Sequence, residues 1–105
     1  MAQFDVYNNP SPKTKRAYPY IVDIQHELIS DIATRMVIPL GKLSHFRNEQ
    51  MQGLTPEIEY NDEKLLLLTP QIASIPANLL KDPIGSLNHF RDDIISSLDF
   101  AITGI

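Results

Sequence analysis

The sequence predicts an α+β fold that is mainly β, with six or so short strands followed by one C-terminal helix. Three observations favour this class. Short stretches rich in β-branched and aromatic residues, bounded by Pro, Asn, Asp or Gly, recur over residues 3–76. The apolar spacing then changes to steps of three and four residues. A chain of 105 residues is long enough to bury about 60 to 68% of its unfolded surface, so we expect one domain, residues 1–105.

The first three strands are expected at Gln3–Tyr7, Tyr18–Ile24 and Thr34–Leu40. The first alternates polar and apolar residues, which is the period of a half-buried strand. Pro19 argues against a central hydrogen-bonded position at the start of the second strand, because proline has no N–H for the ladder. Pro39 is expected to close the third strand.

The middle of the chain predicts a hairpin. Glu57–Tyr60 alternates, Asn61-Asp62 supplies turn residues, and Lys64–Thr69 returns. The aliphatic run in the returning segment is also compatible with a buried helix, but its brevity favours a strand. Gln71–Pro76 adds another extended segment, whereas residues 41–54 are compatible with either a helical turn or a loop.

The last twenty residues predict an amphipathic helix. Ser86 or Asn88 is the expected N-cap. Asp92 and Asp93 lie near its start, where the helix dipole favours negative charge. Gly104 is the expected stop. The apolar stripe at helical spacing comprises Leu87, Phe90, Ile94, Leu98 and Ala101.

Charge and composition narrow the possible partners. The net charge of −4 argues against direct binding of nucleic acid, because phosphate contacts drive most of that affinity. The one basic cluster, Lys13, Lys15 and Arg16, lies in a Pro/Ser/Asn-rich stretch and is expected to be a solvated loop. The absence of cysteine, of a signal peptide and of a long apolar run predicts a cytoplasmic protein without a membrane segment.

No catalytic, cofactor or metal site is expected. The three histidines, His26, His45 and His89, lack the i, i+4 spacing that brings two imidazoles to one metal. A Ser74, His89, Asp93 triad can be assembled from the sequence, but no Gly-x-Ser-x-Gly elbow supports it. The sequence does not look like that of an enzyme.

The predicted helix carries more apolar residues than one stripe needs. Ile95 and Ile102 lie off the stripe, and Phe100 lies on its opposite side. A helix that is apolar on more than one face is either deeply buried or has a second partner. Periodicity leaves both interpretations open.

Segments along essentially the whole chain resemble the CcdB family of bacterial toxins. They occur in the same order and at similar spacing. The segments that carry the resemblance are "MAQFDVY" at residues 1–7, "YIVDIQHELI" at 20–29, "TRMVIPL" at 34–40, "IASIP" at 72–76, "LNHFRDDI" at 87–94 and the closing Gly104-Ile105.

The resemblance implies a fold and a set of partners. The fold is a small SH3-like antiparallel barrel with an extra β wing and one C-terminal helix, assembled as a homodimer. The family binds the DNA gyrase A subunit and traps gyrase on cleaved DNA. A cognate, CcdA-like antitoxin neutralises the toxin, and the complex represses its own operon through the antitoxin. The acidic charge of this chain agrees with leaving DNA contact to the partners.

The resemblance also implies which residues face gyrase, with two departures from the family pattern. Thr103 stands where the best-known members have Trp, and Asp99 stands where the family has an amide. These departures motivate the alternative of a CcdB-like dimer that binds only its antitoxin. The loop at Lys13–Arg16 is longer than in the family pattern. The implied gyrase-binding residues are Leu28, Ile29, Asp99, Ile102, Thr103, Gly104 and Ile105.

Overall fold

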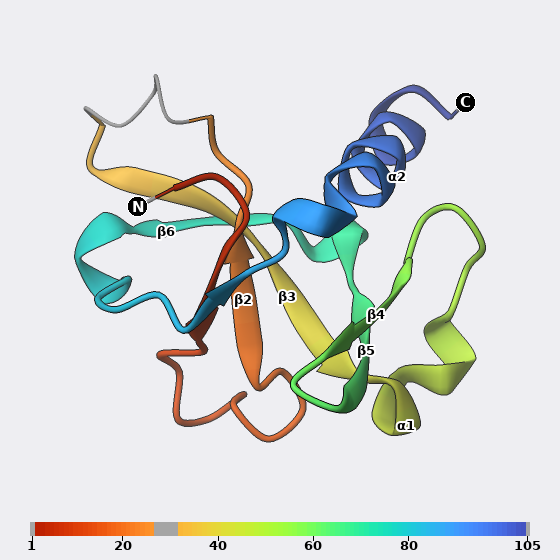
Figure 1. Ribbon diagram of the computed structural model, residues 1–105, viewed down its shortest axis with the longest axis horizontal. Helices are drawn as coiled ribbons and strands as arrows, with labels where there is room; N and C mark the ends of the chain where they lie inside the picture. Colours follow the sequence, from red (N-terminus) through yellow and green to blue (C-terminus); the bar gives the residue numbers. More distant parts are fainter. Residues whose placement is uncertain (1, 27–31, 105) are drawn as a thin grey trace.

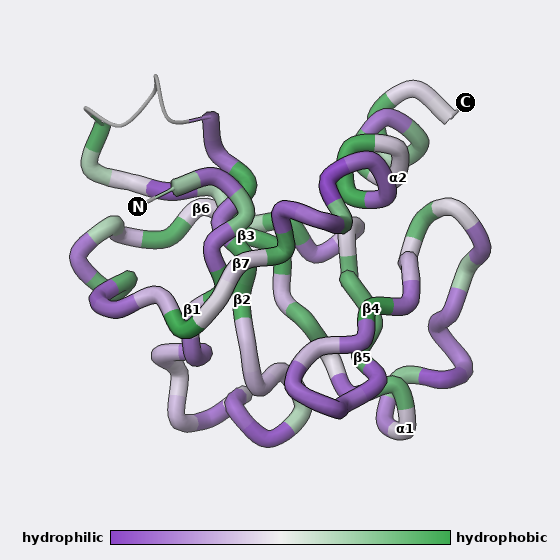
Figure 2. Tube along the Cα trace, in the orientation of Figure 1, coloured by the Kyte–Doolittle hydropathy of each residue, from purple (hydrophilic) through white to green (hydrophobic). Residues whose placement is uncertain are grey.

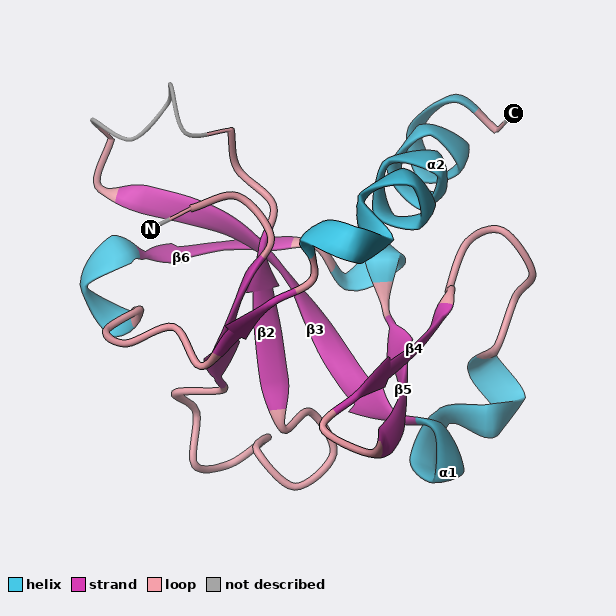
Figure 3. Cartoon of the chain, viewed as in Figure 1, coloured by secondary structure: helices cyan, strands magenta, loops and turns pink. Residues whose placement is uncertain are grey.

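The computed structural model describes residues 2–26 and 32–104 and places seven strands of these ranges in one antiparallel sheet (Figure 1). The sheet order is β4-β5-β3-β2-β1-β7, and β6 pairs with β3 off this path. The sheet curls into a half-barrel, and one long helix follows it (Figure 3). The elements are β1 Asp5–Asn8, β2 Tyr20–Asp23, β3 Thr34–Lys42, α1 Leu43–Phe46, β4 Glu57–Tyr60, β5 Glu63–Leu67, β6 Ala73–Pro76, β7 Gly85–Ser86 and α2 Arg91–Thr103. The predicted α+β class, mainly β with one C-terminal helix, is confirmed.

Pro39 lies inside β3 and does not close it, so the predicted end of this strand is wrong. Its carbonyl accepts a hydrogen bond from the Leu68 N–H at 3.0 Å. In an antiparallel ladder the N–H and C=O of a residue point to the same neighbouring strand. The hydrogen bond that Pro39 cannot donate would therefore also go to Leu68, which lies one residue beyond β5. On the other side, Pro39 lies opposite Ile21 of β2. The ladder tolerates the proline because it lies where pairing with β5 is ending.

The predicted hairpin is confirmed as β4 and β5. Asn61 and Asp62 both have positive φ angles, 54° and 64°, as a two-residue type I′ turn requires. The aliphatic run is a strand, and both of its faces are buried. Leu65 and Leu67 enter the main core, whereas Leu66 packs against a second cluster formed with α1. Burial on both faces explains why this run does not alternate in sequence.

The two edges of the curled sheet approach each other at β4 and β7. The Tyr60 hydroxyl donates a hydrogen bond of 3.2 Å to the Ile84 carbonyl, next to β7. A side chain on Gly85 would collide with this phenol oxygen, so the close approach requires glycine. The Tyr60 ring also packs edge-on against Tyr20, with centroids 5.3 Å apart. Side-chain contacts therefore close the half-barrel where strand pairing does not.

The main core lies between the inner face of the sheet and the start of α2. Val6, Val22, Ile38 and Ile94 are each 0% exposed in this cluster. Figure 2 shows hydrophobic residues along the central strands and hydrophilic residues in most of the connecting loops. The opposite face of the sheet carries a smaller cluster around Tyr7, which the segment after β6 covers.

The α2 helix begins without the predicted side-chain cap. Ser86 Oγ accepts a hydrogen bond from the Asn88 N–H at the start of the 3₁₀ turn at residues 88–90, and it does not reach the helix. The N-cap position of α2 is Phe90, and the first-turn carboxylates are Asp92 and Asp93 as predicted. The buried Ser97 hydroxyl lies 2.9 Å from Thr69 Oγ1 and fixes the helix to the turn after β5.

Asp23 and Arg35 form a buried ion pair on the smaller-cluster side of β2 and β3. Arg35 Nη2 lies 2.8 Å from Asp23 Oδ2, and the two side chains are 1% and 0% exposed. Arg35 also donates to the Gln25 carbonyl, and the Gln25 N–H donates to Asp23 Oδ1. Burial raises the pKa of the Asp23 carboxyl, and hydrogen bonds from Gln25 and Arg35 partly oppose that rise.

Asp23→Asn is expected to destabilise the protein by about 3–5 kcal/mol, because it leaves a buried guanidinium without its counter-charge. The double variant Asp23→Leu with Arg35→Met removes both charges and is expected to cost less than the single change. Urea denaturation of both variants measures this difference. A double variant that is as unstable as the single variant contradicts this account of the ion pair.

Tyr7→Phe is expected to stabilise the protein. The Tyr7 hydroxyl is the one buried side-chain polar atom among residues 2–26 and 32–104 without a hydrogen-bond partner, and such a group costs about 1–3 kcal/mol. Tyr60→Phe is the matched control and is expected to destabilise, because its hydroxyl is bonded to Ile84. Thermal unfolding at pH 7 distinguishes the two, and a loss of stability in Tyr7→Phe contradicts the expectation.

The same variant gives a pH test. Burial raises the pKa of Tyr7 above its ordinary 10.0, so between the two values the folded state holds a proton that the unfolded state has lost. The stability that comes from holding this proton on Tyr7 is fully present below pH 10, and it is lost as the pH rises through the pKa of Tyr7 in the folded state. Tyr7→Phe should therefore lose less stability than the wild type between pH 9 and pH 11, as measured by urea denaturation.

Candidate functional site

The last turns of α2 extend beyond the sheet (Figures 1 and 3). Ile94 is buried, and Ile95 and Leu98 pack against the main core. Residues 99–104 are all exposed. Ala101 belongs to the apolar stripe of the sequence, but it is exposed because the helix has already left the sheet at that point. We call residues 99–104 the helix tip.

The helix tip exposes two large apolar side chains. Ile102 is 81% exposed and Phe100 is 41% exposed. Phe100 lies beside Gly53 of the loop between α1 and β4, since a Cβ added at Gly53 would be 3.7 Å from the ring. The core-filling interpretation of the surplus apolar residues is therefore wrong for the helix tip. Because Phe100 and Ile102 are two residues apart in the helix, they project from different sides of it, and each leaves an apolar side chain exposed.

Backbone geometry ends the helix as predicted. Gly104 adopts a left-handed φ of 74°, and its N–H donates to the Phe100 carbonyl at 2.9 Å. This is the common glycine C-cap, which L-residues with a side chain adopt only with strain. The Thr103 hydroxyl donates to the Asp99 carbonyl at 2.6 Å. Two of the last carbonyls thus have partners, and the last turn is held in a defined shape.

The charge of the helix tip is negative. Asp99 is exposed in the last turn, and no basic residue lies there. The carboxyl end of a helix carries a partial negative charge of its own, so Asp99 adds to it. A partner that covers this surface is expected to bring a positive group close to Asp99.

Four of the seven residues implied by the resemblance lie together in the helix tip. They are Asp99, Ile102, Thr103 and Gly104. Leu28, Ile29 and Ile105 lie outside the described residues. Phe100 was missing from the implied set, although its position opposite the helical stripe is visible in the sequence. The structure adds Phe100 to the candidate surface because it is an exposed residue of the helix tip.

The described residues have no group of three side chains that could hold a metal ion. His45 and His89 lie against the neighbouring rings of Phe46 and Phe90. Within the same ranges, the structure contains no helix that is both long and apolar enough to cross a membrane. Ser74 lies exposed on β6. Among the described residues, Ile102 of the helix tip is the most exposed large apolar side chain.

The curled antiparallel half-barrel, followed by one C-terminal helix with exposed apolar side chains at its end, defines a small, mainly β protein of the α+β class. A family model described as CcdB protein matches residues 3–104, and the chain therefore belongs to the CcdB family. Membership implies a toxin of a toxin–antitoxin module. The family consists of toxins and is not a known class of enzymes.

Replacing Gly104 tests the shape of the helix tip. Gly104→Ala is expected to loosen the last turn by about 1–2 kcal/mol, because alanine is strained at positive φ. No atom lies within 4 Å of the added Cβ, so a clash does not contribute. Gly104→Asn is the matched control, because asparagine tolerates this conformation better. Faster amide exchange at residue 104 in the alanine variant alone is the expected result, and equal exchange in both variants contradicts it.

Proposed function

We propose that this toxin binds the DNA gyrase A subunit, inhibits gyrase and traps it on cleaved DNA, with the helix tip as the main contact. Membership of the CcdB family supports gyrase and an antitoxin as partners in general. The single observation that carries the proposed contact is Ile102, an aliphatic side chain that is 81% exposed on a capped last turn. Leu28, Ile29 and Ile105 remain proposed members of the same contact.

The energetics support a contact of this kind. Full burial of Ile102 against a partner contributes about 1.5–3 kcal/mol before the costs of association. Thr103 lacks the aromatic ring that the best-known members carry at this position. Phe100 lies three residues earlier, on the same side of the helix, and is 41% exposed. We propose that Phe100 supplies aromatic contact area that Thr103 does not.

We further propose that the toxin is a homodimer that is neutralised by a cognate antitoxin. Met36 on β3 and Ile72 before β6 are 41% and 42% exposed on one face of the sheet. Met36 lies opposite Ser74 of β6. A second copy that covers this face would bury both side chains. DNA contact in the repressing complex falls to the antitoxin, because the toxin is acidic.

The alternative is a CcdB-family dimer that binds only its antitoxin. Asp99 and Thr103 favour it, because gyrase must either satisfy the added carboxylate or leave it in water. A supercoiling assay with purified gyrase separates the two functions. Inhibition at micromolar toxin or below removes the alternative, and its absence removes the gyrase proposal.

Deleting residues 103–105 is expected to abolish gyrase inhibition and DNA cleavage while leaving the melting temperature within about 2 °C, because residues 103 and 104 are exposed.

Ile102→Ala is expected to weaken inhibition roughly ten-fold or more. Ile84→Ala is the matched control, since Ile84 is 43% exposed on a different surface. Full inhibition by the truncated protein would exclude the helix tip as the gyrase contact.

A further inference from the structure

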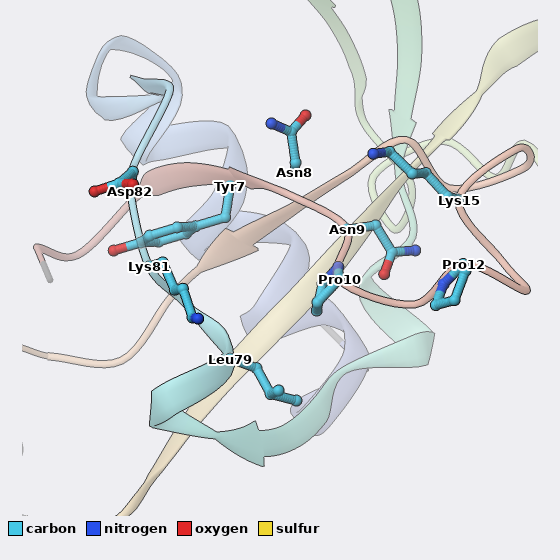
Figure 4. Close-up of a pocket in the computed structure, with 9 residues that line it drawn as sticks. All are labelled: Tyr7, Asn8, Asn9, Pro10, Pro12, Lys15, Leu79, Lys81 and Asp82. Atoms are coloured by element: carbon cyan, nitrogen blue, oxygen red, sulfur yellow. The ribbon is translucent and has the colours of Figure 1, made fainter.

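A groove with a basic end and an apolar end crosses the surface that lies opposite the main core. It consists of two cavities, of about 430 Å³ and about 230 Å³. Both are lined by Asn9, Pro10 and Leu79, so the two cavities are adjacent. Figure 4 shows the larger cavity between the loop after β1 and the segment that follows β6. We call the whole feature the loop groove.

Lys15 and Lys81 line the larger cavity from opposite walls (Figure 4). Asp82 is the one acidic side chain that lines it, and Asn8 adds an exposed amide. The loop groove therefore has a local excess of positive charge, although the chain carries −4 overall. Such a local reversal of charge attracts an acidic partner to one part of the surface.

The smaller cavity is apolar. Its floor consists of Ile21 from β2, Val37 from β3 and Ile75 from β6. Leu79 lies at the junction of the two cavities and is 47% exposed. The smaller cavity has a volume of about 230 Å³, which is sufficient for one bulky aliphatic or aromatic side chain.

The loop wall of the groove is held in place by hydrogen bonds. The Asn9 side chain, in a residue that is 8% exposed, donates to the Tyr18 carbonyl at 2.8 Å and to Thr14 Oγ1 at 3.0 Å. Asn9 Oδ1 also accepts from the Ser11 N–H at 2.9 Å. The loop is exposed at Lys13 and Arg16, as predicted. The hydrogen bonds of Asn9 nevertheless hold the part of the loop that lines the groove in a fixed conformation, which lowers the cost of ordering it on binding.

We propose that the loop groove binds an extended acidic peptide segment of a partner protein, with carboxylates at Lys15 and Lys81 and one bulky apolar side chain in the smaller cavity. Both cavities are open to solvent, whereas small-molecule sites enclose most of their ligand. An extended peptide satisfies the two ends of the groove at once. This inference does not depend on gyrase binding, because none of the residues that line the groove belongs to the helix tip.

The test is selection of random 16-residue peptides on the immobilised full chain, followed by affinity measurement of the selected peptides. Peptides that combine Asp or Glu with Leu, Ile or Phe are expected to be enriched. Lys15→Glu combined with Lys81→Glu should weaken their binding roughly ten-fold or more. Lys13→Glu is the matched control, because Lys13 is an exposed lysine of the same loop but does not line either cavity.

A second pair of variants tests the apolar end. Leu79→Asp is expected to abolish binding, whereas Ile84→Asp, at an exposed position outside the groove, should retain it. Thermal unfolding confirms that each variant is folded. Failure to enrich an acidic and apolar pattern, or selected peptides whose binding is unchanged in the groove variants, overturns the proposal. If the tail deletion loses gyrase inhibition but still binds the peptides, the two surfaces are independent.

Discussion

A carboxylate and a guanidinium that are both shielded from water hold the centre of the sheet together. Asp23 ends β2, and Arg35 lies near the start of β3. Gln25 joins them by donating its N–H to Asp23 and accepting from Arg35, and its side-chain oxygen accepts from the Met36 N–H. A one-residue shift of β3 would leave two buried charges unpaired, so this network fixes the register of the strands on which the rest of the sheet is built.

Both faces of the sheet carry buried clusters, although the described residues contain only one long helix. The inner face packs against the start of α2, and the outer face is covered locally by the segment after β6, which contributes Leu80. This short cover leaves the loop groove beside it, where Leu79 remains half exposed. The loop groove exists because an irregular segment covers this face of the sheet, and such a segment covers less of the face than a helix would.

The helix tip is exposed because α2 is longer than the surface that supports it. Ser97 anchors the helix to Thr69, and the helix then runs past the edge of the sheet. The first half of α2 stabilises the core, and the second half presents Phe100 and Ile102 on a turn that Gly104 ends. Changes at the tip can therefore alter binding without a large change in stability.

Local signals in the sequence predicted β1–β6, the hairpin turn at Asn61-Asp62 and the helix stop at Gly104, because each depends on φ angles or periodicity within a few residues, whereas β7 was not predicted. Four residues of the gyrase contact that the family resemblance implies lie together at the end of α2, because they are close in sequence. Only the tertiary structure decided that Pro39 stays within β3 and that Asp23 meets Arg35. It also decided that the helix tip is exposed and that Lys15 and Lys81 face one groove. These features depend on which segments, distant in sequence, pack together in space. The spacing of residues along the chain does not determine that packing.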